Sequence, residues 1–169
     1  MKLEIGSTVG NLVCVAPIGQ GGSAEVWEVH EQGGEQAWAL KVLHGGGELV
    51  GARMRREAQA QHHLCHPNLL VAQRVLEVGG RPALLMPLVE GPSLARLLAE
   101  HRPSPAEAVA IVRAVTDGLR AAHAQGWTHR DIKPANVLIS LNSQRALPLL
   151  SDFGLARPVD PAEQLTVSG

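Results

Sequence analysis

The chain has 169 residues, of which 45% are hydrophobic, and a formal net charge of −1 at pH 7. This length and apolar content suffice for a substantial core, and the balance of 15 basic against 16 acidic residues gives no electrostatic reason to expect nucleic acid or a membrane surface as partner. No stretch approaches the ~18 to 20 apolar residues of a membrane span, and no signal peptide is recognisable, so we expect a cytoplasmic protein. Two cysteines, Cys14 and Cys65, argue against a disulfide framework.

The first half of the chain has the pattern of a small β-sheet. Between residues 12 and 86, short apolar runs alternate with glycine-rich or polar turns, which predicts strands. One helix is expected between about residues 48 and 64.

After Pro87 the pattern becomes helical. A short helix is predicted from Ser93 to about Glu100, and the capping box at residues 104–107 opens a longer helix that ends at Gly126. One face of this longer helix is predicted to be apolar and to support the segment that follows. The residues of that face are Ala108, Ile111, Val112, Val115, Leu119 and Ala122.

A glycine-rich turn and a lysine in an apolar strand are the first candidates for a functional site. Small residues in the turn at 18–26 would let backbone N–H groups approach phosphate oxygens closely. Lys41 lies in the apolar run 37–43, where a charge requires a carboxylate partner. Each feature alone has an ordinary alternative: the glycines could form a connecting turn, and Lys41 could be a lysine at a strand end.

The most specific motifs are HRDIKPAN at residues 129–136 and DFG at residues 152–154. Together they resemble the catalytic loop and the magnesium loop of the protein kinase family. Lysine two places after the aspartate resembles serine/threonine kinases, and the alanine at position 24 in the glycine-rich turn is similar to bacterial-type members. The resemblance implies an α+β, two-lobed protein-kinase-like fold with a five-stranded antiparallel sheet plus one helix and an incomplete, mainly helical C-lobe. Its implied divisions are an N-lobe at 1–86, a hinge at 87–91 and a partial C-lobe at 92–169.

The resemblance also implies catalytic roles. Asp131 would take up the proton of the substrate hydroxyl, and Lys133 would lie against the transferring phosphate. Mg²⁺ would be held by Asn136 and Asp152. His129 would be a packing residue with no part in proton transfer.

For ATP, the resemblance implies that Lys41 binds the α and β phosphates and pairs with Glu57. Without the resemblance, Glu57 could be a solvated helix charge. Met86 would gate the pocket, and backbone groups of Pro87 and Val89 would pair with adenine. The complete implied set of ATP-binding residues is Ile18, Gly19, Gly21, Gly22, Val26, Ala39, Lys41, Met86, Pro87, Val89 and Leu138.

The implied activity is transfer of the ATP γ-phosphate to a serine or threonine hydroxyl of a protein substrate. Arg130 would pair with a phosphorylated residue of the activation segment, for which Thr166 and Ser168 are candidates. Two alternatives stay open: a non-catalytic ATP-binding scaffold and a small-molecule kinase of related fold. Since the chain ends inside the activation segment, we expect little protein-kinase activity from these 169 residues alone and an exposed apolar face on the longer helix.

A second cluster, His62, His63, Cys65 and His66, consists of side chains that zinc prefers. It has no second ligand pair at zinc-finger spacing, and the sequence HPN at residues 66–68 resembles a turn of the kinase family. We therefore predict no zinc site here.

Overall fold

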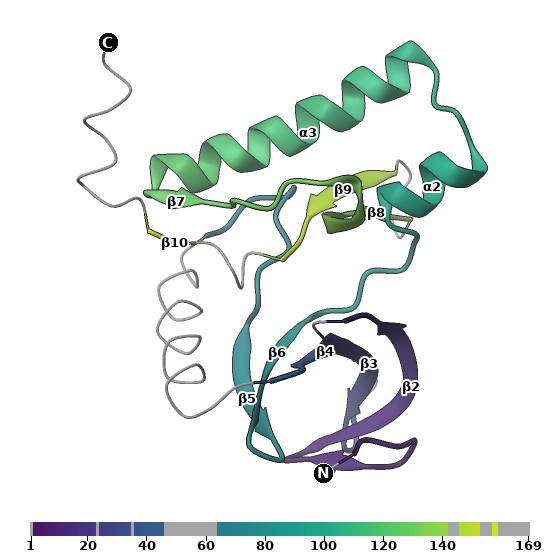
Figure 1. The fold of residues 1–169 in the computed structure, drawn as a ribbon, viewed down its shortest axis with the longest axis vertical. Coiled ribbons are helices and arrows are strands. Elements are labelled where there is room, and N and C mark those ends of the chain that lie inside the picture. Colours follow the sequence, from purple (N-terminus) through teal and green to yellow (C-terminus); the bar gives the residue numbers. More distant parts are fainter. Residues whose placement is uncertain are drawn as a thin grey trace. The chain divides into compact units, whose positions relative to one another are not determined.

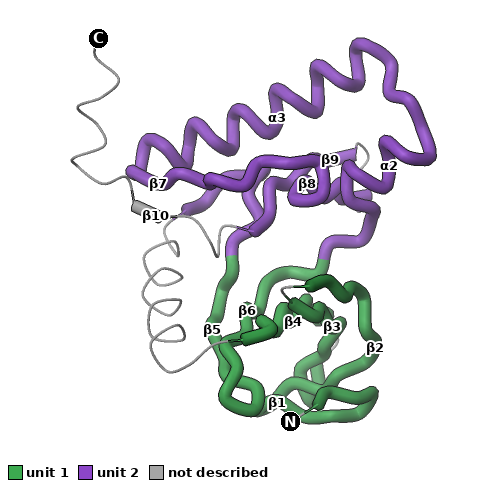
Figure 2. Tube along the Cα trace, viewed as in Figure 1, with its two compact units in different colours: residues 1–62, 72–88 green, residues 63–71, 89–169 purple. Residues whose placement is uncertain are grey.

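The chain forms two compact units, and each is described by itself. The computed structural model describes residues 2–22, 24–34, 36–45, 64–141 and 146–152, and the backbone of residues 157–158. The first unit comprises residues 1–62 and 72–88, and the second comprises residues 63–71 and 89–169 (Figure 2). Residues 63–71 of the second unit thus lie, in the sequence, between the two parts of the first unit.

In its described residues, the first unit is built on an antiparallel sheet of six strands in the order β1-β2-β3-β4-β6-β5 (Figure 1). The resemblance implied five strands, and the additional strand is the two-residue β1, paired through Thr8 with Val13 of β2. The strands are β1 (Thr8–Val9), β2 (Leu12–Gln20), β3 (Ala24–Glu31), β4 (Ala37–Leu43), β5 (Arg74–Val78) and β6 (Arg81–Pro87).

The two faces of β4 have different surroundings. Leu40 and Val42 are fully buried in the hydrophobic core of the first unit. Because successive side chains of a strand point to opposite faces, Ala39 and Lys41 lie on the other face of the sheet. Lys41 is half-buried there, opposite Val26 of β3 and Leu84 of β6.

In the described part of the second unit, there are two α-helices, one 3-10 helix and two short antiparallel ladders (Figure 1). Both predicted helices are confirmed, whereas the helix predicted at residues 48–64 lies outside the described residues, apart from its last residue. Among the described residues, no helix is long and apolar enough to cross a membrane. The elements are α2 (Leu94–Glu100), α3 (Pro105–Ala124), β7 (Trp127–Thr128), the 3-10 helix η1 (Pro134–Asn136), β8 (Val137–Ser140), β9 (Leu147–Leu150) and β10 (Arg157–Pro158), with β7 paired to β10 and β8 to β9.

The apolar face of α3 is buried mainly in the second half of the helix. Val115, Leu119 and Ala122 pack into the core of the second unit, as predicted. Val112 was also predicted on this face, but it is 64% exposed, and Val109 beside it is 66% exposed. Periodicity shows which residues share a face; it does not show how far along the helix a neighbour covers that face. These two valines contribute to a shallow apolar groove on the exposed surface of α3.

The start of α3 provides a test of the predicted capping box. The Ser104 hydroxyl accepts a hydrogen bond from the Glu107 backbone N–H at 3.3 Å, and the Glu107 carboxylate accepts one from the Ser104 N–H at 2.8 Å. We expect Ser104→Ala to lower the free energy of unfolding by about 1 kcal/mol, which corresponds to about 2 to 4 °C in melting temperature.

The matched control is Thr116→Ala on the same helix. The Thr116 hydroxyl only donates to the Val112 carbonyl within α3. Its removal should leave stability unchanged or slightly higher, since alanine is the better helix former. Thermal unfolding followed by circular dichroism measures both variants, and equal effects would show that the cap contributes nothing of its own.

Candidate active site

The motif at residues 129–136 forms a loop between two elements of the second unit. It follows β7, passes through η1, and continues directly into β8. β8 pairs with β9 from Val137↔Leu150 to Ser140↔Leu147, so the residues just before β8 and just after β9 are neighbours. The ladder therefore brings residue 136 of the first motif next to the start of the second motif at residue 152.

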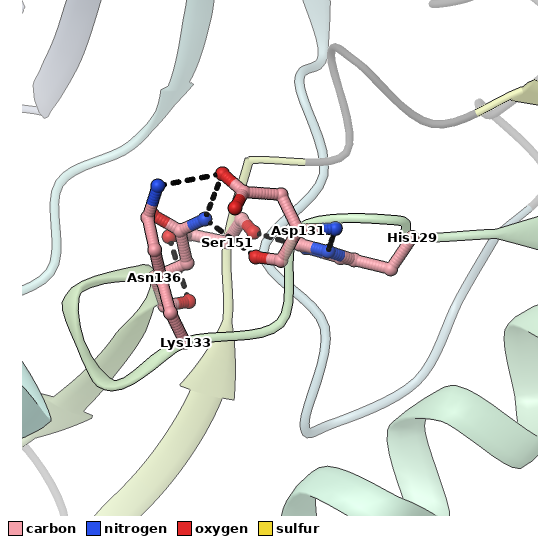
Figure 3. Close-up of polar contacts among 5 residues, drawn as sticks. All are labelled: His129, Asp131, Lys133, Asn136 and Ser151. Carbon is pink, nitrogen blue, oxygen red and sulfur yellow. Dashed lines mark hydrogen bonds and ion pairs between the residues drawn. The ribbon is translucent and has the colours of Figure 1, made fainter.

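Two side chains of this loop, those of Lys133 and Asn136, contact the Asp131 carboxylate (Figure 3). Lys133 Nζ donates to Asp131 Oδ2 at 2.8 Å. Asn136 Nδ2 donates to the same oxygen at 3.0 Å and to the Asp131 backbone carbonyl at 2.8 Å. The carboxylate is partly exposed and is held in one orientation by a cation and an amide.

This arrangement sets the charge of Asp131. The hydrogen bond from the Lys133 ammonium lowers the pKa of the carboxyl below its usual value, and the bond from Asn136 acts in the same direction. The group is therefore an anion at neutral pH. A carboxylate with a low pKa is a weak base that orients a hydroxyl and accepts its proton only as that proton is released.

His129 connects the loop to the end of β9 from a fully buried position. Its Nε2 lies 2.7 Å from the Ser151 carbonyl, and its Nδ1 lies 3.3 Å from the Asp131 backbone nitrogen. Since the carbonyl can only accept and the backbone N–H can only donate, Nε2 is the donor and Nδ1 the acceptor in these two contacts. The ring fixes the backbone on both sides of the site, which agrees with the packing role expected of it.

Two residues of the site have left-handed backbone conformations. Arg130 has φ 66° and Asp152 has φ 69°, and these are the only positive values at non-glycine positions among the described residues. Such conformations are uncommon for residues with a Cβ and persist where neighbouring contacts hold them. Here each of them directly adjoins a residue that belongs to the hydrogen-bonded network, His129 or Ser151.

In the first unit, the strand register places several predicted ATP-binding residues on one face of the sheet. Val26 is opposite both Gly19 and Lys41, and Ala39 is opposite Met86. Cross-strand partners share a face, so this set surrounds Lys41 on the face away from the core. Ala39 and Met86 are buried beside it, whereas Pro87 at the end of β6 is half-buried.

The glycine-rich turn joins β2 and β3. Ile18 is 47% exposed, and Gly19, Gly21 and Gly22 are exposed as well. The Gly21 N–H donates to the Ala24 carbonyl at 2.9 Å and closes the turn. A Cβ added at Gly22 would meet nothing within 4 Å, so in the described structure this side of the turn is open.

Comparison with known proteins agrees with this architecture. The family model described as "Protein kinase domain" matches residues 13–168. The chain belongs to the protein kinase family. The serine/threonine-protein kinase PknD of Mycobacterium tuberculosis is 36% identical over 171 residues, covering 98% of this chain and 25% of PknD. The serine/threonine-protein kinase PkaA of Streptomyces coelicolor is 36% identical over 160 residues, covering 85% of this chain and 29% of PkaA.

Solved structures confirm the fold class. The crystal structure of the PknI kinase domain of M. tuberculosis superposes with a TM-score of 0.79 at 32% sequence identity and covers 99% of this chain. The predicted α+β protein-kinase fold and the similarity to bacterial serine/threonine kinases are thus confirmed. The chain spans 70% of that kinase domain and about a quarter of the length of PknD.

The remaining candidates are distributed between the two units. Val89 and Leu138 are half-buried residues of the second unit, and Leu138 lies in β8 opposite Leu149. Within the second unit, Arg130 is exposed. The predicted partner of Lys41, Glu57, and the candidate phosphorylation sites, Thr166 and Ser168, lie outside the described residues.

The predicted absence of zinc concerns a cluster that is only partly described. His66 Nδ1 accepts the Asn68 backbone N–H at 3.2 Å, and the Asn68 side chain donates to the Pro148 carbonyl at 2.8 Å. This turn therefore supports β9, while His62 and His63 lie outside the described residues.

Sequence reasoning missed two residues that the kinase fold places at this site. Ser151, directly after β9, contacts both His129 and Asn136; its only signal was a polar residue at the end of an apolar run. Gly91, at the end of the predicted hinge segment, has φ 149°, and a Cβ there would lie 1.9 Å from the Ile139 carbonyl oxygen of β8. A single glycine in a linker does not reveal such a close approach.

Proposed function

We propose that this chain is the nucleotide-binding and catalytic part of an ATP-dependent serine/threonine protein kinase. The observation that carries the proposal is the hydrogen-bonded group of Asp131, Lys133 and Asn136 on one loop, with Lys133 Nζ and Asn136 Nδ2 both within 3.0 Å of Asp131 Oδ2. A base, a cation and an amide in this order supply orientation of the attacking hydroxyl and neutralisation of phosphate charge. Within this proposal, residues 1–86 form the N-lobe, 87–91 the hinge and 92–169 part of the C-lobe.

Asp131 would orient the substrate hydroxyl and receive its proton. The low pKa imposed by Lys133 keeps the carboxylate ionised until that proton is released. Lys133 is exposed and linked to Asp131, so its ammonium can turn toward a phosphate without crossing a hydrophobic region. Lys41, on the face of β4 away from the core, would neutralise the α and β phosphates, and Glu57 would hold it there.

The residues assigned to Mg²⁺ have suitable donor atoms. The Asn136 amide nitrogen is engaged by Asp131, which leaves the amide oxygen as the atom to face a metal ion. Asp152 contributes a carboxylate, and oxygen ligands of this kind are the ones Mg²⁺ prefers. Bound Mg²⁺ would neutralise negative charge on the phosphates.

The glycine-rich turn and the β6 end would bind the rest of ATP. Backbone N–H groups of the turn would cover the phosphates, and Met86, Pro87 and Val89 would bind adenine. Leu138 would contact the base from β8. Arg130 would pair with phosphorylated Thr166 or Ser168. The substrate would be a protein, and the kinase would act in the cytoplasm.

A thermal-shift experiment on the chain tests nucleotide binding. Because MgATP would bind the native state only, a concentration of about one hundred times Kd should stabilise it by about 2.7 kcal/mol and raise the melting temperature by about 5 to 10 °C. The double variant Lys41→Met, Asp152→Ala should lose the shift. The control Lys2→Met, at an exposed N-terminal position, should keep it.

The outcomes separate the proposal from its alternatives. A folded sample that shows no shift at millimolar MgATP would contradict it, and a shift retained by the double variant would place the nucleotide elsewhere. If MgATP binds but no longer form of the protein transfers phosphate, the non-catalytic scaffold is the correct alternative. Transfer to a sugar or an antibiotic in preference to protein hydroxyls would identify the small-molecule kinase.

A further inference from the structure

We propose that Ser151 is a positioning residue that holds the two metal-binding residues, Asn136 and Asp152, in register, an inference that rests on the proposed function. The Ser151 backbone N–H donates to the Asn136 carbonyl oxygen at 2.8 Å. The Ser151 hydroxyl donates to the same oxygen at 3.0 Å. Figure 3 shows the serine beside this loop. Both lone pairs of one buried carbonyl are thus used by a single residue.

The two bonds have different origins. The backbone bond continues the β8–β9 ladder by one residue beyond Val137↔Leu150. The hydroxyl bond does not belong to a ladder, and it exists only because residue 151 carries a short side chain with an O–H. Ser151 is 7% exposed and Asn136 is 4% exposed, so water competes little for either bond.

All three polar groups of Ser151 bind the catalytic loop. Besides the two donors directed at Asn136, its carbonyl accepts from His129 Nε2 at 2.7 Å. The next residue, Asp152, then enters a left-handed conformation with φ 69°. An uncommon backbone conformation persists where neighbouring contacts hold it, and the hydrogen bonds of Ser151 hold the residue directly before Asp152.

The physical consequence concerns the metal ion. Asn136 and Asp152 come from two different segments, and the hydrogen bonds between Asn136 and Ser151 connect these segments. Mg²⁺ requires near-ideal octahedral geometry with ligand distances of about 2.0 to 2.1 Å, so small displacements of either ligand reduce its affinity. Removal of outer contacts that orient metal ligands typically costs about 10- to 100-fold in metal affinity.

The test is a Mg²⁺ titration of nucleotide binding to the chain, with a fluorescent ATP analogue at fixed concentration. We expect Ser151→Ala to raise the Mg²⁺ concentration for half-maximal binding about tenfold. Affinity for the analogue without metal should stay unchanged. The fold should persist, because the Asn136 carbonyl keeps the Ser151 backbone N–H. Ser151→Thr, which retains the hydroxyl, should stay within about threefold of the original chain.

Two further variants keep the outcome decisive. Ser140→Ala removes a half-buried hydroxyl at the opposite end of the same ladder and should leave the Mg²⁺ dependence unchanged. Ser151→Cys keeps nearly the same volume with a much weaker donor, so it should resemble the alanine variant even if that one folds poorly.

Three results would overturn the inference while leaving the proposed function intact. One is an equal Mg²⁺ dependence for Ser151→Ala and Ser140→Ala. Another is a Ser151→Ala variant with a lower melting temperature and a lower affinity for the analogue without metal, but with the same Mg²⁺ concentration for half-maximal binding. A purely structural hydroxyl would give that pattern. The third is a threonine variant as impaired as the alanine variant. Absence of any nucleotide binding by the original folded chain would instead contradict the proposed function.

Discussion

Replacement of Asp131 by asparagine is expected to lower phosphoryl transfer about 100- to 10,000-fold in any form of the protein that phosphorylates a protein substrate. Asparagine has nearly the same shape, and its oxygen can still accept from Lys133. It cannot take up the hydroxyl proton. It also removes the anion that Lys133 and Asn136 surround within 3.0 Å. The loss should therefore appear in kcat, because the proton is taken up only as the reaction proceeds.

The matched control is Asp117→Asn. Asp117 lies on α3, where its carboxylate pairs with Arg120 at 3.2 Å, and we expect activity within about twofold of the original. MgATP binding by Asp131→Asn, measured by thermal shift, should persist, which distinguishes loss of chemistry from loss of fold. An asparagine variant that keeps more than about a tenth of the original kcat would remove Asp131 from the proposed role.

Replacement of Gly91 by alanine is expected to have the largest effect on stability. A Cβ at this position would lie 1.9 Å from the Ile139 carbonyl oxygen and 3.3 Å from the Leu141 side chain. Flanking residues hold the segment against β8, since Leu141 N–H donates to the Glu90 carbonyl and Ile139 N–H to the Pro92 carbonyl, each at 2.9 Å. Separation of the segment from β8 would break these bonds. The φ of 149° also disfavours any residue with a Cβ. We therefore expect Gly91→Ala to lower the free energy of unfolding by about 3 kcal/mol or more.

Gly126→Ala separates backbone strain from the steric clash. Gly126 belongs to the same unit and has φ 78°, but a Cβ there would meet nothing within 4 Å. Its replacement should cost about 1 to 2 kcal/mol. Urea unfolding with linear extrapolation measures both variants. If Gly91→Ala were no more destabilising than Gly126→Ala, the result would contradict a close contact between residue 91 and β8.

Much of the local structure follows from short-range patterns. The capping box of Ser104 and Glu107 predicted where α3 begins, because the cap is made by residues three positions apart and needs no tertiary partner. The end of α3 just before Gly126 was predicted in the same way, because glycine readily adopts the positive φ found after the last turn of a helix. The group of Asp131, Lys133 and Asn136 is likewise local, so one motif of eight residues contains the whole hydrogen-bonded cluster.

Features that depend on neighbours distant in sequence were not predictable in this way. Val112 shares a periodicity with Val115 and Leu119, but its exposure depends on what covers the first half of α3. The strand β1 exists only because two residues find partners on β2. Neither fact is encoded in a pattern of apolar residues, since both are decided by packing.

By itself, the sequence determined the family, the helices near residues 93–126 and the chemical character of the loop at 129–136. The tertiary structure decided which residues support that loop. Ser151 reaches Asn136 only because β8 and β9 pair in one register, and Gly91 is required only because β8 passes against it. Local motifs report bonding between near neighbours in the chain, whereas register and close approach are set by contacts that form only when the chain has folded.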